Sequence, residues 1–121
     1  MAEEKYLLLS PDGKLSWIKT QRENMLATFK AKIGCEWVEH VSLPHGFGCV
    51  VDEMGKVKRV PQPVNPYASR FYPGTYYGDP LVGPVVFVRT GYVDGEPDWV
   101  PLTDAQVSLV ALILGQEVPA A

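Results

Sequence analysis

The chain has 121 residues, of which 46% are hydrophobic and 21% are charged, a composition typical of one globular domain that buries a core without metal or disulfide cross-links. A net charge of −3 excludes a general electrostatic attraction to nucleic acid. The sequence has no signal-peptide pattern and no apolar run long enough to cross a bilayer, so we expect a cytoplasmic protein with reduced cysteines and no membrane contact.

Two strands and a helix are predicted for the first third of the chain. Apolar runs at 5–10 and 14–19 flank a Pro-Asp-Gly turn, which is typical of a β-hairpin. A capping-box spacing at Thr20 and Glu23 then predicts a helix that ends at Gly34. The apolar residues of this helix recur at helical spacing and predict one core-facing stripe: Met25, Leu26, Phe29 and Ile33.

Three strands and a short helix are predicted for the middle of the chain. A strand over 35–43 ends at a Pro-His-Gly turn, and a second hairpin pairs 47–51 with 56–60. After a stiff Pro-rich connector, Asn65 and Pro66 predict the start of a short helix, which we expect to end near residue 72 before a loop.

The last third of the chain predicts two strands and a closing helix. An unbroken apolar run within 84–90 is typical of a buried strand, and an Asp-Gly turn leads into a short strand that ends at 100. A capping box at Thr103 and Gln106 predicts a helix over 104–114. Its second half is apolar nearly all round, so we expect either a homodimer contact or a helix enclosed by the sheet and the first helix.

These elements follow the order β-β-α-β-β-β-α-β-β-α. The order predicts an α+β fold, with a single domain over 1–121, a mainly antiparallel twisted sheet and about three helices. Residues 1–20 would form the N-terminal hairpin of that domain.

The residues that often carry catalysis or metals show no recognisable pattern. Cys35, His40, His45 and Cys49 lie close together in sequence but lack the spacing of a zinc site, so we expect no metal and no cofactor. No serine has the context of a nucleophile elbow. We therefore expect a protein that is not an enzyme, and a hydrolase that uses His45 or His40 as a general base is the least favoured hypothesis.

One basic and aromatic stretch stands out in this acidic chain. Four bases and no acid lie between residues 54 and 78, whereas five acids and no base follow residue 90. Arg binds phosphate bidentately and Tyr stacks on bases, so the stretch predicts a site for an anionic, nucleotide-like ligand. The alternative is that the aromatic residues pack the short helix onto the sheet and the bases are solvated. The expected ligand-binding residues are Lys58, Arg59, Asn65 with its amide turned outward, Arg70, Tyr72 and Tyr76.

Several short motifs resemble a known family. They are Val38–Gly46, Val50–Gly55, Asn65–Ala68, Gly78–Val88 and Leu102–Gln106. Through them, residues 31–114 resemble domain of unknown function 3846, a short family of phages, plasmids and bacteria, from which the N-terminal hairpin and the Tyr-rich residues 71–77 depart. The resemblance implies a small accessory protein of a mobile element and no assigned activity.

Two functions are expected on this basis. The first is a phage or mobile-element accessory protein that binds without catalysis and sequesters an anionic nucleotide-like molecule used in host defence, in the host cytoplasm. The alternative is a protein-interaction module that inhibits or redirects a host protein through the acidic last third or the closing helix. In either case we expect a homodimer through the helix at 104–114.

Overall fold

The computed structural model describes residues 3–121, except for the side chain of Tyr76. It confirms a single α+β domain whose sheet has six strands. The strands are β1 (Glu4–Leu9), β2 (Leu15–Thr20), β3 (Val38–Ser42), β4 (Gly48–Asp52), β5 (Val85–Val93) and β6 (Glu96–Val100). The helices are α1 (Met25–Ile33) and α2 (Asp104–Leu114), with 3-10 turns η1 (Arg22–Asn24), η2 (Ala68–Phe71) and η3 (Pro73–Tyr77). Neither α-helix of the described residues is long and apolar enough to cross a membrane.

The sheet is built around β5. Its strands are all antiparallel and lie in the order β2-β1-β5-β4-β3, and β6 pairs with the second half of β5. Val86 of β5 lies opposite Leu8 of β1 and Val50 of β4. The first half of β5, Val85–Val88, has neighbours on both edges and layers on both faces and is fully buried, which explains its unbroken apolar run.

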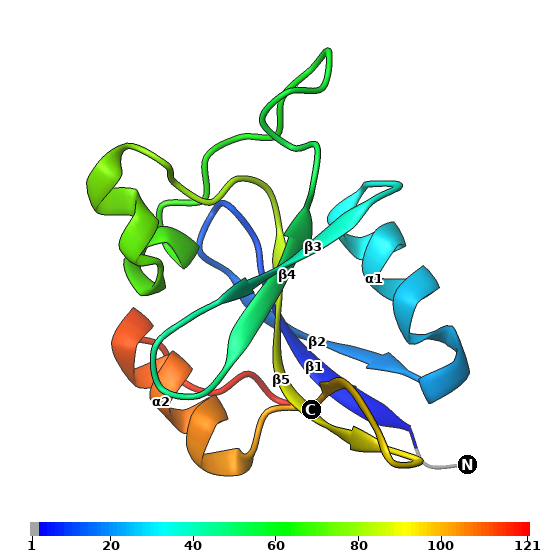
Figure 1. Cartoon of the computed structure of the whole chain (residues 1–121). Helices are drawn as coiled ribbons and strands as arrows, with labels where there is room; N and C mark the ends of the chain where they lie inside the picture. Colours follow the sequence, from blue (N-terminus) through cyan, green and yellow to red (C-terminus); the bar gives the residue numbers. More distant parts are fainter. Residues whose placement is uncertain (1–2) are drawn as a thin grey trace.

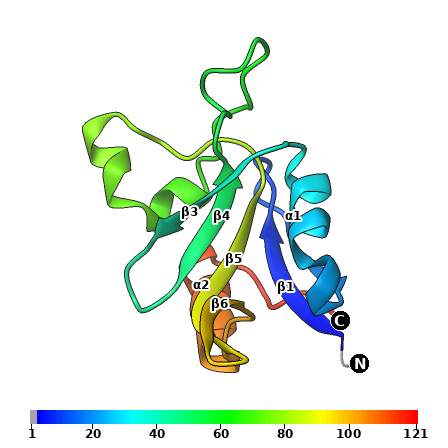
Figure 2. The same ribbon diagram turned by 45° about the vertical axis from the view of Figure 1, so that its right-hand side comes forward.

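Two helical layers cover the two faces of the sheet (Figure 1). On one face α1 contributes Phe29 and Ile33 to a core that also contains Val86. On the opposite face α2 and η2 pack on a larger core that includes Val85 and Phe87 (Figure 2). Alternate residues of β5 therefore belong to different cores, as the two-residue period of a strand requires.

The first predicted helix begins later than its capping-box spacing suggested. Thr20 is the last residue of β2, opposite Glu4, and its hydroxyl lies 2.9 Å from that of Thr28 instead of capping the helix. The chain enters α1 through η1, and neither start has a side-chain cap in the described structure. Leu26, predicted to face the core, is 44% exposed, whereas Gly34 ends the helix in the left-handed conformation as predicted.

The predicted second hairpin is wrong. The strand expected over 35–43 is present only as β3, and β3 pairs with β4 through Val41 and Cys49. The other edge of β4 pairs with β5, so no edge remains for residues 56–60. Those residues instead form a turn-rich loop over 53–60, which projects at the top of Figure 1.

The short helix predicted after Asn65 is also corrected. The segment forms η2 and then η3, where a helix followed by a loop was expected, so the domain has two α-helices rather than about three. Asn65 accepts a hydrogen bond from the amide of Ala68 at 2.9 Å, as a capping residue does. Its NH2 group, however, donates inward to the carbonyl oxygens of Leu9 at 3.1 Å and Gly83 at 2.9 Å. The prediction that this amide faces outward is therefore wrong.

The closing helix agrees with its prediction. α2 spans Asp104–Leu114, Thr103 and Gln106 form both hydrogen bonds of the capping box, and Gly115 ends the helix in the left-handed conformation. The face toward the sheet is buried: Val107, Val110, Ala111 and Leu114.

Candidate functional site

The predicted ligand-binding residues whose side chains the structure describes do not converge on one place. Asn65 is fully buried beneath η2, and Arg59 lies exposed in the 53–60 loop. Lys58, Tyr72 and Arg70 line three different hollows. The side chain of Tyr76 lies outside the part of the chain that the structure describes.

Lys58 is held by a buried carboxylate. It forms an ion pair with Asp52 at the end of β4, and the Asp52 side chain is only 1% exposed. Asp52 also accepts hydrogen bonds from the Met54 amide at 2.9 Å and from Gln62 at 3.3 Å. Burial opposes ionisation of this carboxyl, but the hydrogen bonds from Lys58, Gln62 and Met54 outweigh it and hold the pKa of Asp52 below its usual value. Lys58 therefore anchors the 53–60 loop to the sheet.

Tyr72 and Lys56 share a second carboxylate. The Tyr72 hydroxyl donates to Asp79 at 3.1 Å, and Lys56 forms an ion pair with the same residue. The hydrogen bonds from Lys56 and Tyr72 lower the pKa of Asp79, and the bond to Asp79 raises the pKa of Tyr72. Lys56 and Asp79 are exposed, so their ion pair adds little to the stability of the fold, and its main effect is to orient the half-buried Tyr72.

Arg70 is the base that remains available beside a hollow. Its guanidinium lies 5.2 Å from the centre of the Tyr67 ring and forms no ion pair with any carboxylate of residues 3–121. It borders an open hollow of about 300 Å³. The remaining lining residues are mostly apolar or already hydrogen-bonded: Val64, Pro66, Ser69, Thr75 and Pro80.

A second hollow, of about 580 Å³, lies between the end of α1 and the 53–60 loop. Trp37 and Met54 provide its apolar surface, and Trp37 is 62% exposed. Cys35 lies at the same place; burial and the negative charge of Asp52 raise the pKa of this thiol. A thiol with a raised pKa is a weak nucleophile at neutral pH.

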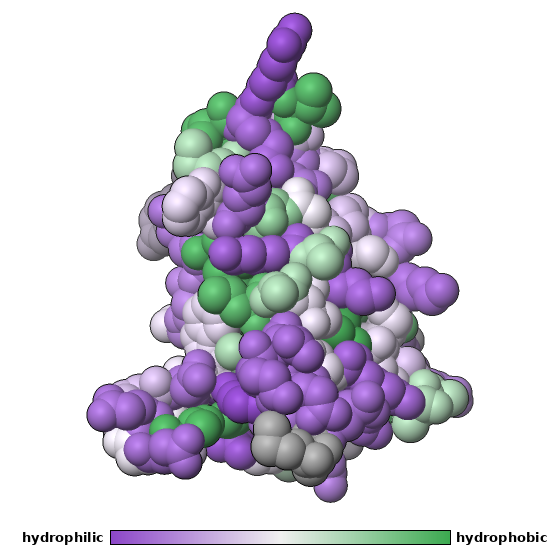
Figure 3. Space-filling model, turned by 90° about the vertical axis from the view of Figure 1, so that its right-hand side faces the viewer, coloured by the Kyte–Doolittle hydropathy of each residue, from purple (hydrophilic) through white to green (hydrophobic). Residues whose placement is uncertain are grey.

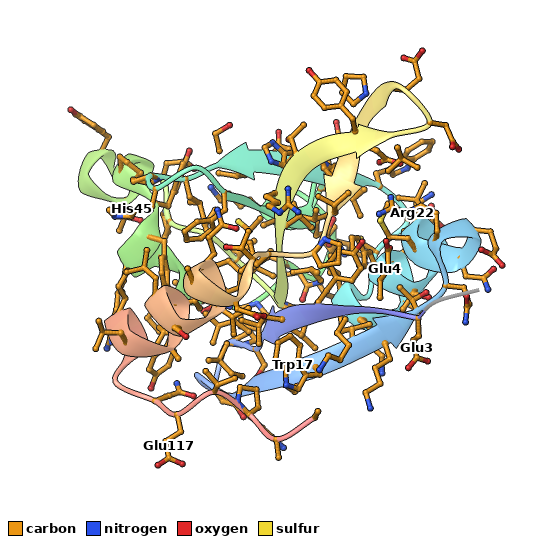
Figure 4. All side chains as sticks on the ribbon, turned by 90° about the horizontal axis from the view of Figure 1, so that it is seen from below. Glu3, Glu4, Trp17, Arg22, His45 and Glu117 are labelled. Carbon is orange, nitrogen blue, oxygen red and sulfur yellow. The ribbon has the colours of Figure 1, made fainter. Side chains whose placement is uncertain are left out.

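The two histidines occupy separate places. The His40 ring on β3 stacks on Trp99 with the ring centres 6.1 Å apart. His45 lies in the exposed turn between β3 and β4, with a φ of 74°, and far from the labelled Glu4 and Arg22 (Figure 4). Among the described residues, no group of three or more His, Cys, Asp or Glu side chains is placed to hold a metal ion.

The most connected polar cluster joins β1, η1 and β6. Arg22 contacts Glu4 at 3.0 Å and Asp98 at 3.1 Å, and Figure 4 shows Arg22 and Glu4 side by side. The Tyr6 hydroxyl accepts from Arg22 at 3.3 Å and donates to Glu4 at 2.9 Å. Burial, followed by the bond to Glu4, raises the pKa of Tyr6 well above its usual value. These bonds connect three elements at one end of the sheet, which is a structural role.

A family model described as Domain of unknown function (DUF3846) matches residues 4–114. The chain belongs to this family. The match begins at the start of β1, so the N-terminal hairpin lies inside the DUF3846 domain and is not an addition to it. No curated protein and no solved structure matches the chain.

Sequence reasoning missed two exposed surfaces of this DUF3846 domain. Trp37 was expected within a strand, but it precedes β3, where its side chain faces solvent. In the 53–60 loop Val57 and Val60 are 71% and 78% exposed beside basic residues. Figure 3 shows hydrophobic and hydrophilic side chains together at this projecting end of the molecule. No local signal in the sequence predicted this loop, because the proline after Val60 lies outside the predicted strand at 56–60.

Proposed function

We propose that this DUF3846 domain is a non-enzymatic binding protein of a phage or other mobile element, and that its Arg70 hollow holds an anionic, nucleotide-like molecule used in host defence. The observation that supports the proposal is the guanidinium of Arg70 beside a mostly apolar hollow. Concave sites with apolar walls and a few polar groups are typical of small-molecule binding.

The two parts of such a ligand match different parts of the hollow. The apolar side chains of Val64, Pro66 and Pro80 offer contacts to a base or another flat ring. Arg70 can bind a phosphate with two parallel hydrogen bonds, and a hydrogen bond to a charged group contributes about 1.5–3 kcal/mol. The contact with the Tyr67 ring restrains the guanidinium near the hollow before the ligand arrives.

Calorimetric titration with a panel of mononucleotides and cyclic dinucleotides tests this proposal. Arg70→Ala is expected to weaken binding on the order of tenfold or more. The reason is that losing one hydrogen bond to a charged group raises the dissociation constant by about one to two factors of ten. Arg59→Ala is the matched control, since Arg59 is also an exposed base but does not line the hollow. Equal affinity in the wild type and Arg70→Ala would refute the assignment.

A specific observation favours a second function, the binding of a host protein. The 53–60 loop carries exposed Val57 and Val60 among Lys56, Lys58 and Arg59. Exposed apolar residues rimmed by charge are typical of protein-interaction surfaces. If this loop binds a host protein, Val57→Ser with Val60→Ser removes capture of that protein from host lysate, whereas Arg70→Ala leaves the capture intact.

We also propose that two copies associate through α2 in the host cytoplasm. The sheet-facing side of α2 is buried, whereas Leu112 on the other side is 76% exposed. A reducing compartment would keep Cys35 and Cys49, which form no disulfide in the described structure, as thiols.

A further inference from the structure

The outer edge of β3 is open. The path of strands in the sheet ends at β3, which pairs on one side with β4 and with no other strand of the described residues. Figure 2 shows β3 at the margin of the sheet, with β4 between it and β5. A strand at an edge presents a row of unpaired N–H and C=O groups, to which another extended chain can bind.

The hydrogen bonds that flank β3 determine which of its backbone groups point outward. The Leu43 amide donates to the Phe47 carbonyl at 3.0 Å, and the Glu53 amide donates to the Trp37 carbonyl at 3.0 Å. Hydrogen-bonded positions alternate along an antiparallel pair, so the odd-numbered residues of β3 bond to β4. The N–H and C=O groups that point away from β4 are therefore those of Val38, His40 and Ser42.

β3 lacks the features that usually keep an edge strand from pairing. Those features are lysine or proline on the strand, a bulge, or a very short strand. β3 has five residues and neither lysine nor proline, and its pairing with β4 continues without a bulge from Val38 to Ser42. By contrast β2, at the other margin of the sheet, carries the exposed Lys19.

The charge around this edge favours a basic partner. Between Gly34 and Gly55 the chain has four acids and no Lys or Arg. Two of the acids, Glu36 and Glu39, are exposed and form no ion pair among residues 3–121. Trp37 lies between them in sequence and is 62% exposed, and the face of an exposed Trp ring attracts Lys and Arg side chains.

The nearest lysines do not cancel this negative charge. Lys56 lines a hollow together with Glu39, but it is already paired with Asp79. Lys58 lines another hollow together with Glu36 and Trp37, but it is paired with Asp52. The carboxylates of Glu36 and Glu39 are thus left for a partner.

We propose that the open edge of β3 binds an extended, basic segment of a partner protein. The backbone of the segment pairs with Val38, His40 and Ser42, and its Lys or Arg side chains lie beside Trp37 and Glu39. In binding by strand addition, the backbone hydrogen bonds provide affinity and the alternate side chains provide specificity. A hollow of about 240 Å³ at the same edge, lined in part by His40 and Ser42, accepts a side chain from the other face of the segment.

A second copy of this chain fits the edge less well. The pairing that uses all three outward residues of both strands is antiparallel, with His40 opposite His40 of the partner subunit. Glu39 is then a diagonal neighbour of Glu39 of the partner subunit, about 7–8 Å away on the same face. These like charges repel each other, whereas a basic segment meets the same carboxylate with the opposite charge.

Amide hydrogen exchange of the full chain, followed by NMR, is the first test. In the free protein the amides of Glu39 and Val41 should be protected, and those of Val38, His40 and Ser42 should exchange rapidly. A blocked six-residue peptide of alternating lysine and valine should slow exchange of these three amides, about twofold at half-saturation.

Three outcomes of this test would overturn the proposal. If the three outward amides are already protected in the free monomer, the edge is not open. If the lysine–valine peptide leaves their exchange unchanged at millimolar concentration, the edge does not bind a basic strand. If protection rises with protein concentration and without peptide, a second copy occupies the edge instead.

Control peptides and matched variants separate backbone pairing from charge. The same peptide with every amide N-methylated cannot donate hydrogen bonds and should not bind, and a glutamate–valine peptide should bind more weakly. Glu39→Lys should weaken binding of the lysine–valine peptide about fivefold. Glu96→Lys makes the same change in net charge at an exposed residue of β6 and should leave binding unchanged. Equal affinity of the acidic and basic peptides, or of Glu39→Lys and the wild type, would overturn the basic partner. The edge shares no residue with the Arg70 hollow, so this result is independent of nucleotide binding there.

Discussion

Asn65 joins three segments of the chain through one buried side chain. Its oxygen accepts from Ala68, and its NH2 group donates to Leu9 of β1 and to Gly83 before β5. This side chain was predicted to contact a ligand, but it fixes η2, the turn that carries Arg70, against the sheet. A buried amide that satisfies all its partners is a structural group whose loss leaves those partners unpaired.

Asn65→Ala should therefore destabilise the fold strongly. It removes three hydrogen bonds and leaves the carbonyl oxygens of Leu9 and Gly83 and the amide of Ala68 buried without this partner. Each unpaired group costs about 1–3 kcal/mol. We expect a loss of roughly 3 kcal/mol or more in the free energy of unfolding, measured by urea denaturation. Asn24→Ala is the control, because Asn24 is exposed and makes no capping bond in the described structure. A loss no larger than that of the control would contradict the role given to Asn65.

Asp52 should make stability depend on pH at the acid end. An unfolded aspartate titrates near pH 4, and the pKa of folded Asp52 lies below its usual value. The contribution of Asp52 to the free energy of unfolding is therefore complete above about pH 4 and is lost as the pH falls through the pKa of the folded state. Asp52→Asn should flatten this acid limb in fluorescence-monitored unfolding, whereas Glu53→Gln, at the exposed neighbouring residue, should leave it in place.

At the scale of the elements, the features predicted correctly are turns and helix ends that depend on residues close together in the chain. The Pro-Asp-Gly turn between β1 and β2, the Asp-Gly turn between β5 and β6, and the capping box of α2 all appear as predicted. Thr20 failed as a cap because its place in the register of β2, opposite Glu4, took priority. The hairpin after β4 failed because β5, which is distant in sequence, occupies the edge that residues 56–60 would need.

The capping box of α2 gives a test at this scale. Thr103→Ala removes the hydroxyl that accepts from the Gln106 amide at 3.2 Å, and the expected loss is about 1 kcal/mol of unfolding free energy. Ser108→Ala, in the middle of the same helix and exposed, should be neutral or slightly stabilising because alanine is the better helix former. Thermal and urea unfolding of both variants measures the difference, and similar effects of the two substitutions would count against the cap.

At the scale of the whole molecule, the predicted site was dispersed by charges just outside the basic stretch. The acid-free window ends immediately before Asp79 and begins shortly after Asp52, and these two carboxylates pair with Lys56 and Lys58. Counting charges within the stretch could not reveal these pairs, because they depend on how β4 and the loop before β5 meet in space. Of the predicted bases that line a hollow, Lys58 is paired with Asp52, whereas Arg70 forms no ion pair among residues 3–121.

Native mass spectrometry of wild type and Arg70→Ala, purified gently side by side from the same host cells, tests whether the Arg70 hollow holds a ligand. We expect the wild type to carry a small additional mass that is released on denaturation and identified in the extract as an anionic, nucleotide-like compound. Arg70→Ala should fold normally and lack that mass, since Arg70 is exposed and its guanidinium contacts only the surface of the Tyr67 ring among the described contacts. The same bound compound at the same occupancy in both proteins, or a wild type without one that also fails to bind any member of the nucleotide panel, would contradict the claim.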